Sequence, residues 1–302
     1  MLEKKYLVSD RDEKYPPKLI LFLSVDIQNS TNFKNEHIGN IDKWYKFFHN
    51  FFKQFPIYYE SYLIESKALL EYPPKQDSEI NAQIWKSLGD ELIFQFEISH
   101  RTEITWYILS FKQALEKFHK EIQESTPYLG VKGTSWLAGF PVNNVELNNT
   151  NKTDFIGPSI DLGFRLSKHA LPYKFVISVE LAYLLLMNPS VTAIQFSYSG
   201  KEVLRGILKD KPYPIIWIKL ENNTRNNDTD DSKIIPDINK DYLREFCLNF
   251  IKNYPEQLFI PFIDSDPKFL SLPEGYQAKY KKSIDVLKGL EERFEDSLNS
   301  KD

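Results

Sequence analysis

The chain has 302 residues, of which 42% are apolar and 15% aromatic, so it can form a sizeable core and is not a disordered chain. Its formal net charge of −4 at pH 7 excludes the overall positive field on which general binders of nucleic acids and anionic membranes depend. Cys247 is the single cysteine, which excludes an internal disulfide and a thiolate metal cage, and we expect it to pack among apolar side chains. No apolar run reaches the roughly 18 residues that a transmembrane helix needs, and the charged start of the chain lacks a signal-peptide pattern. These features predict a soluble, cytoplasmic protein.

Hydrophobic periodicity predicts strands and helices along the first 220 residues. The predicted elements, in chain order, are a strand at 18–26, a helix at 41–55, a loop at 72–80, hairpin strands at 84–88 and 92–96, a helix at 104–122, a strand at 128–140, a helix at 159–170, and strands at 175–179 and 213–220. We expect Pro56 to end the first helix, because proline has no backbone N–H to donate. Gly89-Asp90 marks the hairpin turn, since glycine adopts the backbone angles of a tight turn easily.

The composition changes after residue 220. Residues 221–231 are rich in Asn, Asp and Thr and have almost no apolar side chains, which is typical of a linker. Two stretches with apolar stripes at helical spacing follow, over 242–254 and 280–298. We therefore predict a main domain at 1–220, a linker at 221–235 and a helical extension at 236–302. We expect the extension to pack on its own main domain, with a partner-binding helix as the alternative.

Two carboxylates occupy special places in this pattern. Asp26 ends the first buried strand, and Asp90 lies in the hairpin turn. Taken singly, each has a structural explanation, since aspartate is common at strand ends and in turns. Taken together, they could hold a divalent cation, because hard cations prefer carboxylate oxygens on rigid elements.

Four segments in order resemble the motifs of class III nucleotidyl cyclase domains. They are DIQNST at 26–31, KSLGD at 86–90, DFIGPSIDLGFRL at 154–166 and Arg205-Gly206. The resemblance covers residues 18–220 and implies an α+β fold, in which helices pack on a ferredoxin-like palm sheet, followed by a C-terminal helical extension. It identifies the main domain, 1–220, as a nucleotidyl cyclase catalytic domain.

The resemblance also implies a reaction and a set of roles. The ribose 3′ oxygen of a nucleoside triphosphate attacks the α-phosphorus, and pyrophosphate leaves. Two Mg²⁺ or Mn²⁺ ions per site assist, and two chains form a head-to-tail homodimer with shared sites. The implied roles are metal binding for Asp26, Ile27 (through its carbonyl) and Asp90, stabilisation of transition-state charge for Arg165, base recognition for Lys86 and Asp154, and ribose or phosphate contacts for Asp161 and Arg205.

Two residues depart from the pattern of the family. Asp161 replaces the usual asparagine, so an acceptor-only carboxylate stands where the family contacts the ribose. Arg205 replaces lysine, which keeps the charge and changes the geometry. Ordinary structural roles are the alternatives for two others: Arg165 could pair with a neighbouring carboxylate, and Lys86 could be a solvated edge residue. The Gly-Asp-Glu hairpin at 89–91 also resembles diguanylate cyclases, but Leu88 stands where their first glycine belongs.

The segment at 157–166 and the helical tail look most like the pyrimidine cyclases of bacterial Pycsar antiphage systems. That likeness implies a cyclic pyrimidine nucleotide, cCMP or cUMP, made from CTP or UTP, and an effector activated by it. Lys86 donates hydrogen bonds and ionised Asp154 accepts them, which suits cytosine and adenine, admits uracil and disfavours guanine. An adenylate cyclase making cAMP from ATP is therefore one alternative. A degenerate, non-catalytic nucleotide-binding module is another.

Overall fold

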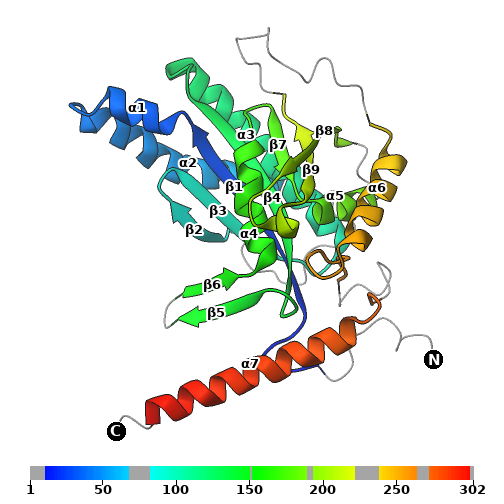
Figure 1. The fold of residues 1–302 in the computed structure, drawn as a ribbon. Helices are drawn as coiled ribbons and strands as arrows, with labels where there is room; N and C mark the ends of the chain where they lie inside the picture. The colour runs from blue at the N-terminus through cyan, green and yellow to red at the C-terminus, as the bar shows by residue number, and fades with distance from the viewer. Residues whose placement is uncertain are drawn as a thin grey trace.

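The computed structural model describes residues 11–67, 82–149, 152–188, 193–221, 238–263 and 272–299, and it forms a mixed α/β structure (Figure 1). Its elements, in chain order, are β1 (Lys18–Gln28), α1 (Ser30–Glu36), α2 (Ile41–Ser66), β2 (Ile84–Leu88), β3 (Glu91–Glu97), α3 (Arg101–Ser125), β4 (Gly130–Phe140), β5 (Val145–Asn149), β6 (Lys152–Ile156), α4 (Pro158–Leu166), η3 (Ser167–His169), β7 (Lys174–Ile177), α5 (Val179–Leu186), β8 (Phe196–Val203), η5 (Ile207–Asp210), β9 (Pro212–Lys219), α6 (Lys240–Asn253) and α7 (Tyr276–Asn299).

Seven strands form one sheet, and two form a separate ribbon. The order in the sheet is β2-β3-β1-β4-β7-β9-β8, and β5 pairs with β6. β1 lies antiparallel between β3 and β4, whereas β4 and β7 are parallel. The β4-β1-β3-β2 order, with helices after β1 and β3, is the ferredoxin-like arrangement that the sequence predicted, and the α+β fold class is confirmed.

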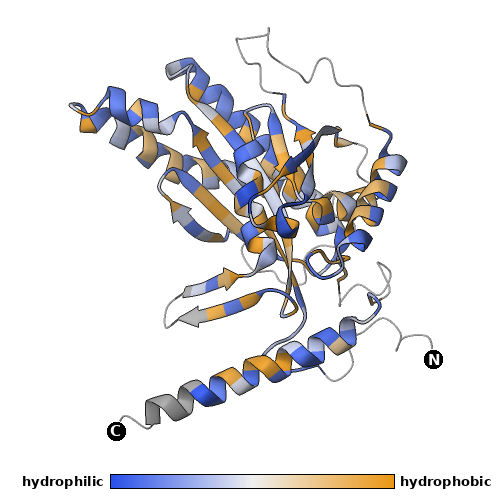
Figure 2. Ribbon diagram, viewed as in Figure 1, coloured by the Kyte–Doolittle hydropathy of each residue, from blue (hydrophilic) through white to orange (hydrophobic). Residues whose placement is uncertain are grey.

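The two faces of the sheet carry different side chains, because successive residues of a strand point to opposite sides. Leu21, Leu23 and Val25 of β1 face the main core, which contains the buried sides of α2, α3, α5 and α6. Phe22 faces the other way, into a smaller aromatic cluster shared with β6 and α4. Asp26 is four residues after Phe22 in the same strand, so its side chain points to the same face, which the large helices leave uncovered. Figure 2 shows many apolar residues along the central strands of the sheet.

The first helix is longer than predicted. α2 continues through Pro56 to Ser66, so the expectation that this proline ends the helix is wrong. Proline removes one backbone hydrogen bond and costs about 3 kcal/mol in a helix interior. On either side of it, however, Phe55, Tyr59 and Leu63 are fully buried, and burial of each large side chain contributes roughly 2–3 kcal/mol. Packing therefore outweighs the local cost.

Most other predicted elements are confirmed to within four residues at each end. The helices α1 and α5 and the strands β5, β6 and β8 were not predicted. The predicted loop at 72–80 lies outside the described residues, as does the linker at 221–235 apart from Glu221. The division into a main domain, a linker and an extension therefore stays a prediction.

The helical extension packs on the main domain, as expected. Leu243, Cys247 and Phe250 of α6 are buried in the main core, and Cys247 is a free thiol. α7 lies apart from α2 and α3 (Figure 1) and buries Tyr280 and Ile284 in a small cluster of its own. Within the described residues, no helix is both long enough and apolar enough to cross a bilayer.

Candidate active site

One end of the central strands carries three carboxylates and a lysine. The register places Asp26 of β1 opposite Glu91 of β3 on one side and Lys132 of β4 on the other. The Lys132 Nζ atom lies 2.7 Å from Asp26 Oδ2, and both side chains are about one-quarter exposed (21% and 25%). The Ser24 hydroxyl donates a hydrogen bond to Glu91. Because Asp26 and Lys132 are partly exposed, solvent and small ligands can reach this end of the sheet.

Asp90 is held next to Asp26 by the hairpin turn. Gly89 has a positive φ of 68°, which closes the turn between β2 and β3. The backbone N–H of Ile27 donates to the Asp90 carbonyl oxygen at 3.4 Å, and the Ser30 hydroxyl donates to the Asp90 carboxylate. The turn is thus fastened to the end of β1.

The carboxylates at this end perturb one another. Partial burial, followed by the charge of Asp26, raises the pKa of Asp90. Burial and the charge of Asp26 also raise the pKa of Glu91, against the opposing effect of the Ser24 hydrogen bond. Lys132 is the one cation in the described residues that forms an ion pair with this group. The site holds more negative charge than that lysine neutralises, which favours a bound cation.

Lys86 and Asp154 form the second part of the site. A β-bulge between Ile84 and Lys86 shifts the register of β2, so that Lys86 lies opposite Ile93, on the face that carries Asp26. Its Nζ atom lies 2.6 Å from Asp154 Oδ1 and 2.9 Å from Oδ2. The side chains are 33% and 38% exposed, so the pair is accessible.

The chain neighbours of this pair hold it in place. Trp85 packs against Phe155 with ring centroids 5.3 Å apart, and both rings contact Phe22 of β1. Such aromatic pairs contribute about 0.5–1.5 kcal/mol beyond the burial of their area. Desolvation alone would raise the pKa of Asp154, but hydrogen bonds from Lys86 and from the Phe155 N–H lower it. Asp154 is therefore ionised at neutral pH and serves as an acceptor.

α4 positions the predicted arginine. Gly163 lies flat against Trp136, where an added Cβ would come within 2.2 Å of the indole ring. This contact fixes the helix over the aromatic cluster and leaves Arg165 half-buried and Asp161 exposed. In the described part of the chain, Arg165 makes no ion pair, so its expected alternative role in a local salt bridge is not observed.

Of the eight residues predicted for the site, the structure brings some together and leaves others apart. Asp26, Ile27 and Asp90 meet at one end of the sheet, and Lys86 contacts Asp154. Arg165 and Asp161 project from α4, and Arg205 is exposed in the turn after β8. No hydrogen bond or ion pair among the described residues joins the last three to either group.

The sequence analysis missed two charged residues of the site. Glu91 follows Asp90 directly, and its charge next to a candidate metal ligand was a usable signal. Lys132 had no such signal, because only the β1–β4 register shows that it faces Asp26.

No protein-family model and no curated protein matches the chain. Among solved structures, the chain is similar to the adenylyl cyclase CyaB from P. aeruginosa, with a TM-score of 0.50 and 14% identity over 70% of this chain and 98% of that chain. Lower scores are found for the guanylate cyclase domain of RhGC from Catenaria anguillulae in complex with GTP (0.43, 10% identity, 68% and 98% covered) and for an adenylate cyclase from Trypanosoma brucei (0.41, 14%, 66% and 89%). The likeness to CyaB shows that the chain has the fold of class III nucleotidyl cyclases.

Proposed function

We propose that the chain is a class III nucleotidyl cyclase that converts CTP or UTP into cCMP or cUMP and pyrophosphate. The product would be a second messenger in antiphage defence, read by a separate effector. The observation that carries the catalytic part is the arrangement of Asp26 and Asp90, two carboxylates fastened side by side at an accessible end of the sheet. The likeness of the fold to an adenylyl cyclase also supports the proposed cyclase activity.

The residues at this end fit a divalent cation. Two aspartates and the Ile27 carbonyl supply the oxygen donors that Mg²⁺ and Mn²⁺ prefer, and Mg²⁺ commonly uses one or two carboxylates together with substrate phosphates. The raised pKa of Asp90 reflects, after burial, repulsion from Asp26, which a cation would relieve. Lys132 would have to release Asp26, at a small cost for an ion pair that is partly exposed. When bound, two ions would neutralise the triphosphate and acidify the ribose 3′ hydroxyl.

The proposed reaction is an internal phosphoryl transfer. The ribose 3′ oxygen forms a bond to the α-phosphorus, while the bond from that phosphorus to the oxygen bridging the β-phosphate breaks. Pyrophosphate leaves with the electron pair of that bond, and the hydroxyl proton passes to water. Arg165, which has no partner of its own among the described residues, stabilises the charge on the α-phosphoryl group. Arg205 holds the terminal phosphates, and Asp161 accepts a hydrogen bond from the ribose.

We propose that two chains share each site in a head-to-tail homodimer. Asp26 and Asp90 come from one chain, whereas Lys86, Asp154 and Arg165 come from the other. In support, both groups lie on the face of the sheet that the large helices leave uncovered, and no hydrogen bond or ion pair among the described residues joins one group to the other. A site that is incomplete in one chain is consistent with completion by a second.

A pyrimidine is the proposed base. The Lys86–Asp154 pair offers a donor and an acceptor side by side, which match N3 and the amino group of cytosine. Uracil can instead present its N–H to Asp154 and a carbonyl to Lys86. Adenine offers the same arrangement at N1 and its amino group, so the preference for a pyrimidine rests on the likeness of segment 157–166 and the helical tail to the pyrimidine cyclases.

The test supplies each of the four ribonucleoside triphosphates separately with Mn²⁺ and identifies the product by mass spectrometry. We expect cCMP or cUMP. Asp154→Asn should reduce the preference among the four substrates, whereas Asp285→Asn, an exposed carboxylate of α7, should leave it unchanged. Conversion of ATP alone would replace the proposal with an adenylate cyclase. Nucleotide binding without any product would leave a non-catalytic binding module.

A further inference from the structure

A cavity of about 580 Å³ lies where the helical extension meets the sheet. Its wall comes from the residues before and in β1, the end of β3, the end of β4, the last turn of α6 with the segment that follows it to residue 263, and the first turn of α7. This volume falls within the roughly 300–1,000 Å³ that is typical of small-molecule sites. The extension therefore encloses a space large enough for a ligand of nucleotide or cofactor size.

The cavity is separate from the candidate active site. Leu19, Glu97 and Gly139 line it, and they belong to the same three strands as Asp26, Glu91 and Lys132. The three lining residues lie at one end of those strands, while the charged residues lie at the other. Leu19 and Asp26 are seven residues apart, which corresponds to about 23 Å at about 3.3 Å per residue.

The lining combines an apolar floor with a positive rim. Leu19, Ile98 and Leu258 are buried apolar residues of the wall, and Phe259 and Phe262 add aromatic rings. Among the described residues, four cationic side chains line the cavity, against two carboxylates. An apolar body with a negatively charged group would match both features.

One of those cations, Lys18, pairs with Glu146 at 3.2 Å. Two others also have defined surroundings. Lys279, in the first turn of α7, donates a hydrogen bond to the Pro255 carbonyl at 3.0 Å, which joins the two parts of the extension at the rim. Lys252 is exposed at the end of α6 and forms no ion pair among the described residues. The positive end of the α7 dipole also lies at the rim and adds to the attraction for an anion.

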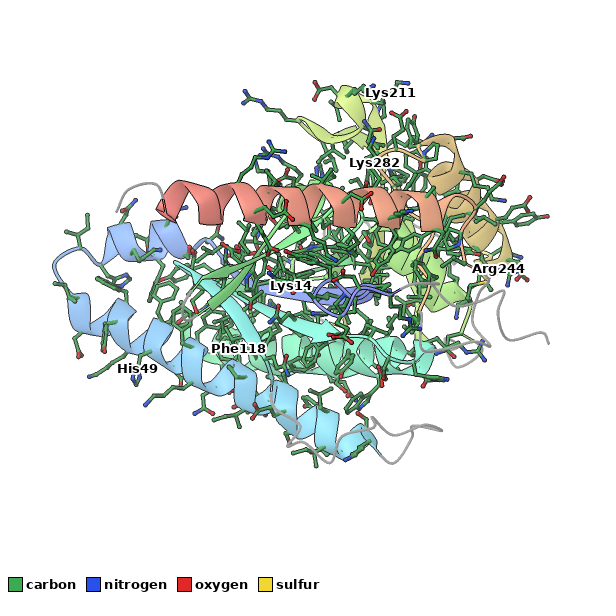
Figure 3. All side chains as sticks on the ribbon, turned by 90° about the horizontal axis from the view of Figure 1, so that it is seen from below. Lys14, His49, Phe118, Lys211, Arg244 and Lys282 are labelled. Atoms are coloured by element: carbon green, nitrogen blue, oxygen red, sulfur yellow. The ribbon has the colours of Figure 1, made fainter. Side chains whose placement is uncertain are left out.

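Polar contacts hold the segment before β1 against α7, and this segment forms part of the cavity wall. The Tyr280 hydroxyl accepts a hydrogen bond from the Asp12 N–H at 2.9 Å and donates one to the Tyr15 carbonyl at 3.0 Å. Lys288 pairs with Asp12 at 2.5 Å, and Lys14 pairs with Glu291 at 2.6 Å. In Figure 3, which looks from the side of α7, this helix runs alongside the segment that carries Lys14.

We infer that this cavity is a second ligand site, which binds a small molecule with an apolar, partly aromatic body and one anionic group. The inference does not depend on the cyclase reaction, because it rests on the cavity alone. The dye 1-anilinonaphthalene-8-sulfonate has this chemistry, and N-phenyl-1-naphthylamine has the same body without the charge. The two dyes therefore separate the contribution of the anion from that of the apolar floor.

The test titrates the full chain with each dye and follows fluorescence. We expect saturable binding of the anionic dye at one site per chain. Lys252→Glu should weaken it about fivefold or more while changing the neutral dye little, since reversing one rim charge alters binding by about 1 kcal/mol. Lys281→Glu, which reverses an exposed charge of α7 that does not line the cavity, is the matched control.

A second variant tests the cavity itself. Gly139→Val should weaken both dyes at least fivefold, because it fills part of the space beside Phe259, whose ring would lie 3.4 Å from a Cβ at Gly139. Thermal melting of each variant checks that the fold is kept. Equal effects of Lys252→Glu and Lys281→Glu, or undiminished binding by folded Gly139→Val, would overturn the inference.

Discussion

Glu180 is a buried carboxylate whose ionisation should destabilise the folded chain. It lies in the first turn of α5 and is 1% exposed. The side chains of Ser178 and of Tyr213 of β9 form hydrogen bonds with it, and the Tyr213 hydroxyl donates to Glu180 Oε2 at 3.5 Å. Cys247 of α6 lies nearby, and burial together with the charge of Glu180 raises the pKa of that thiol to about 12. Among the described residues no lysine or arginine pairs with Glu180, and burial raises its pKa from 4.5 to about 7.

The sign and size of the effect follow from this shift. Below pH 4.5 the carboxyl group is protonated in both the folded and the unfolded chain, so it makes no difference. Between pH 4.5 and 7 the unfolded chain loses this proton and the folded chain keeps it, so the free energy of unfolding falls as the pH rises. Above pH 7 the carboxyl group is ionised in both the folded and the unfolded chain. The free energy of unfolding has then fallen by about 3 kcal/mol in total.

Glu180→Gln removes the titration while keeping the shape of the side chain and a partner for Tyr213. The test measures the free energy of unfolding by urea denaturation at pH 5 and pH 8, for the wild type and for this variant. The wild type should lose about 2.5 kcal/mol more than the variant between these two values, because all other titrating groups cancel in the difference. Glu124→Gln, at an exposed position of α3, is the control. If Glu180→Gln follows the wild-type pH dependence, the carboxyl group is not held protonated in the folded chain.

Three further predictions concern the site and the extension. Asp26→Ala or Asp90→Ala should each lower turnover at least about 100-fold with little change in melting temperature. A chelator should lower the turnover of the wild type to a similar extent. Near-normal turnover in either variant would exclude the proposed metal ligands. Mixing inactive Asp26→Ala chains with inactive Arg165→Ala chains should restore activity, since one site of the mixed dimer is intact, and no recovery despite demonstrated chain exchange would contradict shared sites. Tyr280→Phe should lower the free energy of unfolding by about 1–2 kcal/mol, because its hydroxyl makes two hydrogen bonds to the backbone of the N-terminal segment. An unchanged value would show that these two hydrogen bonds do not stabilise the folded chain.

Local features of the sequence determined much of the framework. The apolar run at 18–26 predicted β1, and Gly89-Asp90 predicted the turn between β2 and β3, because strand burial and turn geometry depend on a few neighbouring residues. The order of the motifs predicted the fold class. The same local reasoning failed at Pro56, where the cost of a proline is local but the burial of Phe55 and Tyr59 that offsets it comes from residues distant in the chain.

Only the tertiary structure decided which charged side chains meet. Lys86 and Asp154 are 68 residues apart in the chain, and a bulge in β2 together with the packing of Trp85 on Phe155 brings them into contact. Lys132 reaches Asp26 through the register of β1 and β4. A shift of one residue in that register would send its side chain to the opposite face, and no pattern within either strand fixes which residues of the two are paired. The cavity beneath the extension has the same origin, because its wall combines segments from both ends of the sequence.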